Sequence, residues 1–363
     1  MPSPLALTPR AKTLLVLGLL VLVGLSVHRM WWAEPPGPYV AFGGQTMGTT
    51  WEVKLAGSGL GPNEIRTAAG AAEETLAEVV ALMSNWEPDS EISRFNAHPT
   101  LEPFAISAPT LEVVAVAERF SQETDGAFDI TVGALVEAWG FGPDRRPEKA
   151  PDSRAIEALR KQVGFQRLEI IPEQNALRKS TPALQLDLSA IAKGYGVDRV
   201  AEALEALGHS DYLIEVGGEL RAAGRKRSGQ PWRVAIERPS DSYRAIQEVL
   251  DLNESAMATS GDYRNFYEEG GRRFSHTLDP RSGAPISHAL ASVTVVDPSA
   301  MQADAWATAL NVLGPEEGYS LASQRGVPAY FIIREGSGFS TLMTEEMSSL
   351  LRPYAEEPAP QAP

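Results

Sequence analysis

One stretch of the chain decides the fold class: residues 183–216, with the sequence ALQLDLSAIAKGYGVDRVAEALEALGHSDYLIEV. Apolar and polar residues alternate over Ala183–Leu188, which is the period of a half-buried strand. Ser189 comes next and is a good N-cap residue, so we expect a helix from there to Gly208. The β-branched and aromatic run Tyr212–Val216 then predicts a second strand. The stretch therefore combines a strand, a helix and a strand.

On either side of this stretch, the hydrophobic pattern predicts further elements. Helices are expected at Glu64–Met83, Pro109–Thr124, 152–164 and 302–313, and strands at Trp232–Glu237, Ala291–Val296 and Ala329–Arg334. Because strands occur in runs as well as between helices, the pattern favours an α+β fold with mixed or antiparallel sheets and packed helices. We expect a single domain over residues 40–352, between a linker at 33–39 and a disordered Pro-rich tail at 353–363.

The composition excludes several classes of function. The 363 residues carry 32 Lys and Arg against 47 Asp and Glu, which is a formal net charge of −15. No basic run is interleaved with aromatic residues, so nucleic acid is not expected as a partner. The sequence has no cysteine, which excludes disulfides, thiolate metal sites, a cysteine nucleophile and a lipid attached to cysteine.

Residues 1–32 have the pattern of an export signal. Two basic residues precede the apolar run Leu14–Val27, which is followed by Trp31 and Trp32. A membrane span needs about 20 apolar residues, and the tryptophans extend this run to nearly that length. We expect an uncleaved signal anchor in a bacterial inner membrane, with the domain that follows in the periplasm. A cleaved signal peptide is the alternative.

A candidate metal site lies in the predicted C-terminal helix. Asp304, Ala307 and Thr308 stand at positions i, i+3 and i+4, so they share one helical face. A carboxylate and a hydroxyl are hard oxygen ligands, which suit Mg²⁺ better than zinc. In the alternative interpretation, Asp304 only interacts favourably with the dipole at a helix N-terminus. The spacing by itself leaves both interpretations open.

Other candidates for chemistry are spread along the chain. Asp187 ends the predicted strand, where backbone N–H groups favour phosphate, and Lys193 lies one turn into the predicted helix. Either residue could instead be a helix-starting or solvated charge. His276 lies beside a turn rich in Pro and Gly, where it could move protons or serve as a hydrogen-bonded structural residue. Trp86 and Phe128 could stack on a flavin or adenine ring, or could belong to the core.

Five segments of distinctive sequence occur in a fixed order. They are TMGTT at 46–50, MSNWEPDSEISRFN at 83–96, GAFDITVG at 126–133 leading to WGFG at 139–142, LDLSAIAKGY at 186–195, and a last one that runs from TSGDY at 259–263 through HTLDPRSG at 276–283 to ADAWATAL at 303–310. Together they resemble the FAD:protein FMN transferase (ApbE-type) family, whose members were once described as thiamine-biosynthesis lipoproteins. The resemblance extends from about residue 47 to about residue 350.

The resemblance implies a role for each matching residue. The residues expected to contact FAD are Met47, Trp86, Ala127, Phe128, Asp129, Asp187, Lys193 and Leu278. The expected magnesium ligands are Asp304, Thr308 and the backbone oxygen of Ala190. Ala307 falls where some members have a second aspartate, so this ligand is a main-chain atom here or is missing. His276 and Asp304 are the expected catalytic residues, and the candidate base is His276 or a carboxylate such as Asp279.

The resemblance also implies an activity. FAD would be the substrate and Mg²⁺ the cofactor, and FMN would pass to a Thr or Ser hydroxyl of a target protein with release of AMP. The expected acceptors are membrane electron-transport subunits, such as those of Na⁺-translocating NADH:quinone reductase. Two alternatives stay open: an FAD pyrophosphatase that uses water, and a non-catalytic periplasmic flavin-binding protein that does not need the metal ligands. The lack of cysteine departs from the lipoprotein members, which excludes a lipid anchor but not export.

Overall fold

The computed structural model describes residues 37, 39–57, 60–143, 149–239, 245–262, 266–269 and 272–352. The chain from Tyr39 onward forms one compact unit. The predicted signal anchor at 1–32, the tail at 353–363 and most of the predicted linker lie outside the described residues. Among the helices that the structure describes, none combines the length and the apolar character that a membrane crossing requires.

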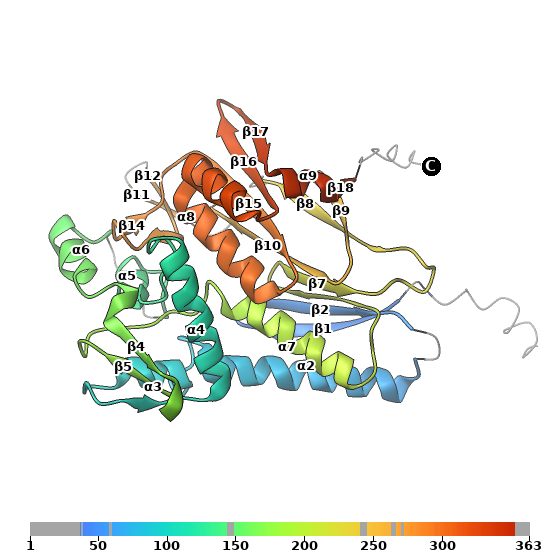
Figure 1. Cartoon of the computed structure of the whole chain (residues 1–363), viewed down its shortest axis with the longest axis horizontal. Helices are drawn as coiled ribbons and strands as arrows, with labels where there is room; N and C mark the ends of the chain where they lie inside the picture. Colours follow the sequence, from blue (N-terminus) through green and yellow to red (C-terminus); the bar gives the residue numbers. More distant parts are fainter. Residues whose placement is uncertain are drawn as a thin grey trace, which may run out of the picture. The chain divides into compact units, whose positions relative to one another are not determined.

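A sheet of eight strands forms the centre of this unit (Figure 1), in the order β1-β2-β6-β7-β10-β15-β16-β17. Its strands are β1 Val40–Thr46, β2 Thr49–Leu55, β6 Tyr212–Val216, β7 Glu219–Ala223, β10 Ser255–Gly261, β15 Leu290–Asp297, β16 Ala329–Glu335 and β17 Gly338–Met343. Every neighbouring pair is antiparallel. The α+β class with antiparallel sheets is thereby confirmed.

Three long helices cover one face of the sheet: α2 (Pro62–Met83), α7 (Ala192–Ala206) and α8 (Ala300–Arg325). Because side chains alternate along a strand, every second residue of β2 and β6 faces these helices. Val53, for example, is fully buried in the same apolar cluster as Leu76 of α2. This helix layer and the sheet enclose much of the core.

A small sheet covers the opposite face. It is made of β8 (Trp232–Arg238), β9 (Ala245–Leu252) and β18 (Leu351–Arg352), in the order β18-β9-β8. Leu213 of β6 points to this side, where it packs in one cluster with the fully buried Trp232. The main sheet is therefore buried on both faces in this region.

A second group of elements packs beside the N-terminal part of α8. Its helix α4 (Ala108–Glu123) contacts α8 and shares a core cluster with it, and Figure 1 shows the group in green next to the helix layer. The remaining elements are α3 Glu91–Ala97, β3 Phe104–Ala105, α5 Gly133–Ala138, α6 Ser153–Arg160, β4 Leu168–Ile171, β5 Ala176–Lys179, β11 Phe266–Glu269, β12 Arg272–Ser275, β13 Leu278–Asp279, β14 Ala284–Pro285, α9 Glu345–Leu350 and two short 3₁₀ helices at Phe165–Arg167 and Pro172–Gln174.

Most predicted elements agree with the structure, but two helices end at other residues than predicted. The prediction ended the C-terminal helix near residue 313, whereas α8 continues to Arg325 through a kink at Gly314, which has a φ of 79°. Pro315 follows the kink and lacks the N–H that a regular helix needs there. The helix predicted at 152–164 ends at Arg160, as α6.

The strand predicted at 183–188 was wrong. Side chains from a distant segment take up the backbone groups that a neighbouring strand would bind. The N–H of Leu186 donates to Oδ1 of Asn96 (2.7 Å), and its carbonyl accepts from Nδ2 of Asn96 (2.8 Å) and Nδ2 of Asn85 (2.9 Å). Gln185 forms an isolated bridge with Val132. The alternating pattern was real, but asparagines replace the partner strand.

The helix start predicted at Ser189 was also wrong, because α7 begins at Ala192. The N–H and the hydroxyl of Ser189 both donate to Oδ1 of Asp187, at 2.8 and 2.5 Å. This local turn competes with helix capping, as short polar side chains often do. The helix starts one turn later.

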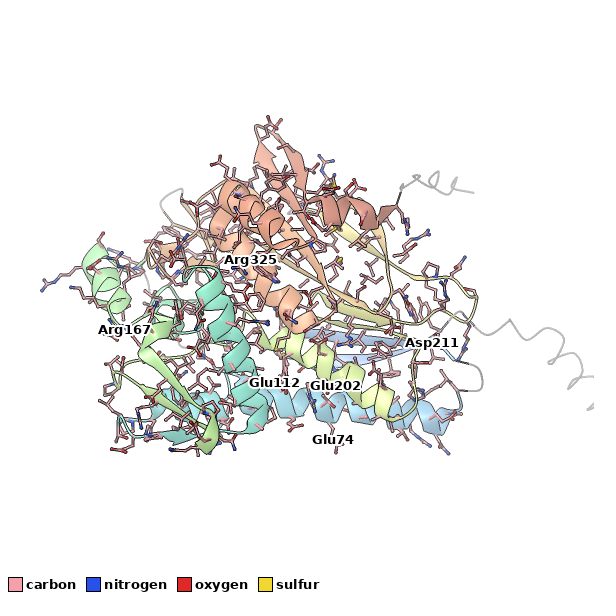
Figure 2. The ribbon with its side chains drawn as sticks, viewed as in Figure 1. Glu74, Glu112, Arg167, Glu202, Asp211 and Arg325 are labelled. Carbon is pink, nitrogen blue, oxygen red and sulfur yellow. The ribbon has the colours of Figure 1, made fainter. Side chains whose placement is uncertain are left out.

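Exposed carboxylates project from the outer helices. Glu74 on α2, Glu112 on α4 and Glu202 on α7 are exposed, and Figure 2 labels them on these three helices. The pKa of the nearby Tyr195 is raised to about 12, mainly by burial, and the charges of Glu112 and Glu202 contribute to the same shift. The helix layer therefore has an acidic outer surface.

Candidate active site

The N-terminal ends of α7 and α8 meet at the centre of the candidate site. A Cβ at Gly194 would lie 2.2 Å from the carbonyl oxygen of Ala300, so a glycine is needed for this close approach. The N–H of Gly194 donates to Oδ2 of Asp304 (3.1 Å), and Asp304 is 4% exposed. The contact holds a buried carboxylate at the junction of two helix N-termini, where negative charge is favoured.

Lys193 lies between two buried carboxylates. Its Nζ is 3.0 Å from Oε1 of Glu219 and 3.4 Å from each carboxylate oxygen of Asp304. Glu219 is the first residue of β7 and is 4% exposed. In the turn before it, Gly217 has a φ of 61°, and a Cβ there would lie 3.3 Å from Cδ of Lys193. We call Glu219, Lys193 and Asp304 the Lys193 cluster.

The pKa values within the Lys193 cluster reflect burial and charge together. Burial by itself lowers the pKa of Lys193, but the charges of Asp304 and Glu219 outweigh this effect and raise the pKa above its ordinary value. Burial is the largest influence on Glu219 and raises its pKa, whereas the charge of Lys193 opposes this shift. The cluster therefore keeps a cation beside Asp304 at neutral pH.

The residues predicted to bind magnesium lie around this junction. Asp304 and Thr308 are one turn apart on α8, before its kink. Ala190 lies in the turn three residues before Lys193, and it packs against the core cluster that contains Ala307. The three predicted ligands supply hard oxygen atoms, and the ammonium group against Asp304 shows that this carboxylate accepts a cation. The donor set therefore fits Mg²⁺.

The position of Ala307 supplies no carboxylate. Its side chain is 1% exposed and packs in the core. Within the described ranges, no three side chains of the types His, Cys, Asp and Glu are gathered as a metal cage. A metal ion at this junction would therefore depend on one carboxylate, one hydroxyl and main-chain oxygen.

Met47 and Trp86 lie in two turns. Met47 has a φ of 48° in the turn between β1 and β2, a region that non-glycine residues rarely adopt. Its Cε lies 3.3 Å from the position that a Cβ on Gly196 of α7 would take. Trp86 is 64% exposed. An exposed indole ring suits the predicted role of Trp86 in stacking on a flat ligand ring.

Phe128 belongs to the core. It is 2% exposed, its neighbour Ala127 is 1% exposed, and its ring lies 5.9 Å from the ring of Phe120. The structure thus supports the core alternative for the ring of Phe128. Contacts from Ala127 and Phe128 to a ligand would come from the main chain.

The carboxylate of Asp129 already has partners within the chain. Its Oδ1 accepts from the N–H (2.8 Å) and hydroxyl (2.7 Å) of Thr131, and its Oδ2 accepts from the N–H of Phe165 (2.7 Å). Burial raises the pKa of Asp129, although these hydrogen bonds oppose the shift. The side chain orders the loop after α4.

Asp187 lies where three of the distinctive segments meet. Its N–H donates to the carbonyl of Ile130 (2.7 Å), which belongs to segment 126–133. The preceding residue, Leu186, is held by Asn85 and Asn96, which belong to segment 83–96. Segments that are far apart in the sequence thus fix one short loop before α7.

His276 directly follows β12, and Leu278 is the first residue of β13. The ring of His276 lies 6.4 Å from that of Phe141, edge to face, and Leu278 is 7% exposed. The residue between them, Thr277, accepts a hydrogen bond from Nδ2 of the fully buried Asn311 (3.3 Å). Because Asn311 is on α8, the turn of His276 is tied to the helix that carries Asp304.

Comparison with known proteins identifies the family of this chain. The family model described as the ApbE family matches residues 47–331. The chain belongs to the ApbE family. It is 44% identical over 321 residues to the FAD:protein FMN transferase of Vibrio cholerae serotype O1, covering 88% of this chain and 94% of that protein. It is 41% identical over 313 residues to the Escherichia coli K12 protein of the same name, covering 85% and 88%.

Solved ApbE structures have the same fold. Flavin Transferase ApbE from Vibrio cholerae superposes with a TM-score of 0.79 at 43% identity, covering 86% of this chain and 99% of that chain. The apo form of the Pseudomonas stutzeri flavinyl transferase ApbE gives a TM-score of 0.78 at 44% identity, covering 86% and 96%.

In this ApbE-family chain, sequence reasoning missed several residues of the site. Asn85 and Asn96 lie inside a segment that the sequence marked, but their contacts with Leu186 cross about a hundred residues of chain. Asn311 had no signal beyond its place on the face of Asp304. Glu219 follows a pair of glycines, which marks a turn without indicating the buried lysine beside it.

Proposed function

We propose that this chain is an FAD:protein FMN transferase, which cleaves FAD and attaches its FMN half to a Thr or Ser hydroxyl of a target protein. The names of relatives at 44% and 41% identity support this activity. The observation that carries it is the buried carboxylate of Asp304, which lies beside the ammonium group of Lys193 where the N-termini of α7 and α8 meet. Such a junction suits a metal ion and a phosphate-containing ligand together.

Asp304, Thr308 and the carbonyl oxygen of Ala190 are the proposed ligands of Mg²⁺. When bound, the ion would offset the negative charge that grows on the leaving phosphate as the pyrophosphate bond breaks. Asp304 supplies the formal charge that retains the ion. Lys193 and the N-terminal N–H groups of α7 provide positive potential for the phosphates of FAD.

The remaining steps are assigned to the ring-binding residues and to His276. Trp86 and Met47 hold the isoalloxazine ring, while Asp187 and the main chain of residues 127–129 position the rest of FAD. The acceptor oxygen forms a bond to the phosphorus on the riboflavin side, the bond to the AMP phosphate breaks, and His276 takes the hydroxyl proton.

The turn around His276 supports this assignment of the base. Asp279, the nearest carboxylate in the sequence, is paired with Arg281: its Oδ1 accepts from the N–H (2.9 Å) and Nε (3.0 Å), and its Oδ2 accepts from Nη2 (3.1 Å). These hydrogen bonds from Arg281 occupy the lone pairs that a base would use. His276 is therefore the better candidate.

The proposed acceptors are membrane electron-transport subunits, such as those of Na⁺-translocating NADH:quinone reductase. The proposed location is the bacterial cell envelope, with the chain anchored in the inner membrane and the catalytic domain in the periplasm. The basic and apolar pattern of residues 1–32 supports the location.

Labelling of an acceptor tests the proposal. Purified protein is incubated with FAD, Mg²⁺ and an acceptor subunit, and bound flavin is read as fluorescence in a denaturing gel. Asp304→Asn keeps an acceptor for the N–H of Gly194 but removes the charge, so we expect transfer to fall by about 100-fold or more. Thermal unfolding of the variant is the control for folding.

A reaction without acceptor separates transfer from hydrolysis. A transferase releases AMP in proportion to labelled acceptor and releases little without it. Steady AMP release in the absence of acceptor would favour the FAD pyrophosphatase instead. FAD binding without AMP release under either condition would favour a non-catalytic flavin-binding protein.

A further inference from the structure

Glu219 is the member of the Lys193 cluster to which the mechanism above gives no role. Its Oε1 lies 3.0 Å from Nζ of Lys193. Its Oε2 is buried and lacks a hydrogen-bond partner in the part of the chain that the structure describes. Leaving a carboxylate oxygen buried without a partner is costly. An ion pair that served stability alone would gain nothing from this unpartnered Oε2.

Lys193 is shared unequally between its two carboxylates. Charge-assisted hydrogen bonds from nitrogen to oxygen are typically about 2.7–2.9 Å long. The contact with Glu219 is close to that range at 3.0 Å, whereas both contacts with Asp304 are 3.4 Å. The ammonium group thus makes its shorter hydrogen bond to Glu219 and longer contacts to Asp304.

A divalent cation on Asp304 would compete with this ammonium group. The two cations repel each other at short range, and both need the lone pairs of the same carboxylate. Lys193 would have to withdraw from Asp304, and its flexible four-carbon stem permits this movement. The unpartnered Oε2 belongs to the carboxylate that Lys193 already contacts, so it offers an acceptor for the displaced ammonium.

The turn between β6 and β7 restricts where Lys193 can go. A Cβ at Gly217 would lie 2.8 Å from Cγ2 of Thr49 and 3.3 Å from Cδ of Lys193, so this turn packs closely against the lysine stem. Gly217 has a positive φ of 61°, which the tight turn before Glu219 requires. The turn limits the lysine stem on one side, although 28% of the Lys193 side chain stays exposed. Of the two carboxylates that the ammonium contacts, only Glu219 stays available to it when a cation occupies Asp304.

We propose that Glu219 is a positioning residue that receives the ammonium group of Lys193 when a divalent cation binds Asp304. This inference rests on the proposed function, because it takes Asp304 as a metal ligand. Glu219 makes the displacement of Lys193 less costly and keeps its charge near the phosphates of FAD. It acts through Lys193 and does not touch the metal or the substrate.

Direct metal binding tests the inference without any turnover. FAD-free protein is titrated with Mn²⁺, which prefers the same oxygen ligands as Mg²⁺, and free Mn²⁺ is measured by electron paramagnetic resonance. We expect Glu219→Gln to weaken Mn²⁺ binding by about tenfold, a typical coupling between two sites. We expect Lys193→Met to strengthen binding, because no ammonium group then competes for Asp304.

The double variant separates the positioning role from simple attraction between Glu219 and the metal. If Glu219 acts through Lys193, the change Glu219→Gln has little effect in the Lys193→Met background. The matched control is Glu52→Gln, which removes a carboxylate that is 46% exposed and paired with Lys54 on the strand β2. We expect this control to bind Mn²⁺ like the wild type.

Each contrary result has a distinct meaning. Unchanged binding by Glu219→Gln, or equal weakening of binding in the Lys193→Met background, would overturn the role of Glu219 and leave the metal site in place. Failure of the wild type to bind Mn²⁺, or equal binding by Asp304→Asn, would overturn the metal site itself. If Glu219→Gln melts far below the wild type, the test rests on the Lys193→Met variant instead. An affinity of Lys193→Met for Mn²⁺ equal to that of the wild type would then reject the inference.

Discussion

Two lysines of this protein have buried surroundings that act on them in opposite ways. Lys193 faces the carboxylates of Glu219 and Asp304, whose charges outweigh burial and raise its pKa. Lys179, at the end of β5, is 2% exposed and has no ion pair within the described residues. Burial lowers the pKa of Lys179 to about 8. The pKa of a lysine is thus raised in one buried setting and lowered in the other.

Main-chain dipoles take the place of charges around Lys179. Its Nζ donates to the carbonyl oxygens of Asn96 (2.9 Å), His98 (3.2 Å) and Pro182 (3.5 Å). It also lies 4.8 Å from the centre of the ring of Phe95. These contacts join the end of α3 to the loop that leads to Asp187.

The different partners of the two lysines indicate different roles: a functional role for Lys193 and a structural role for Lys179. Two carboxylates can exchange an ammonium group for another cation, so Lys193 is suited to a site where a ligand arrives. The carbonyl groups around Lys179 are fixed by the fold and bring two chain segments to one ammonium group, so Lys179 is suited to holding a loop. We therefore expect loss of Lys193 to reduce activity and loss of Lys179 to reduce stability.

Loss of the charge of Lys193 should have the largest effect. Lys193→Met removes the cation that faces the phosphates of FAD, and we expect transfer to fall by about 100-fold or more. Initial rates of acceptor labelling at saturating Mg²⁺ measure this. A rate within about threefold of the wild type would mean that Lys193 contributes less than about 1 kcal/mol to the reaction, since a tenfold change in rate corresponds to about 1.4 kcal/mol. That result would contradict a role for Lys193 in the reaction.

Loss of Lys179 should act on stability. Lys179→Met leaves three part-buried carbonyl groups without their donor, and we expect the free energy of unfolding to fall by about 2 kcal/mol at pH 7. Unfolding in urea measures the change, with the surface variant Glu52→Gln as a control. An unchanged midpoint would mean that water or neighbouring N–H groups replace the lysine.

Loss of the side chain of Asn96 should loosen the loop that carries Asp187. Asn96→Ala removes two hydrogen bonds to Leu186, while the backbone contact of Asn96 with Lys179 stays. At about 1 kcal/mol of net loss, we expect the KM for FAD to rise by about fivefold with a smaller change in kcat. A drop in kcat at constant KM would contradict a role in holding the loop.

The pH dependence of stability should also reflect the burial of Lys179. The pKa of Lys179 is lowered to about 8 from the ordinary value of 10.5, so the unfolded chain binds this proton more tightly than the folded protein. The contribution of this group is therefore fully present above pH 10.5 and is lost as the pH falls through about 8. As the pH rises from about 8 to 10.5, we expect the wild type to gain stability relative to Lys179→Met. Urea unfolding of both proteins across this pH range measures the difference. A flat difference would show that Lys179 keeps an ordinary pKa.

Periodic features of the sequence predicted much of this fold. The apolar stripe of α2 and the strand β6 were located closely, because each depends on local pattern and local propensity. The shared face of Asp304 and Thr308 was also predictable, since both lie in one regular stretch of α8.

Contacts between distant segments account for the rest. The pattern at 183–188 has the period of a strand, yet the side chain of Asn96 takes the place of the neighbouring backbone. Phe128 is an aromatic residue in a marked segment, but its ring is buried against Phe120. Neither outcome is visible in local sequence, because each is decided by a residue that packing brings close.

The dependence of FMN transfer on a divalent cation tests the central claim most directly. Protein stripped of metal with a chelator is supplied with FAD and acceptor, and labelling is followed while Mg²⁺ is added back. We predict no labelling above background without the cation, full recovery with Mg²⁺ for the wild type, and no recovery for Asp304→Asn. Labelling at full rate by the stripped wild type would contradict the account.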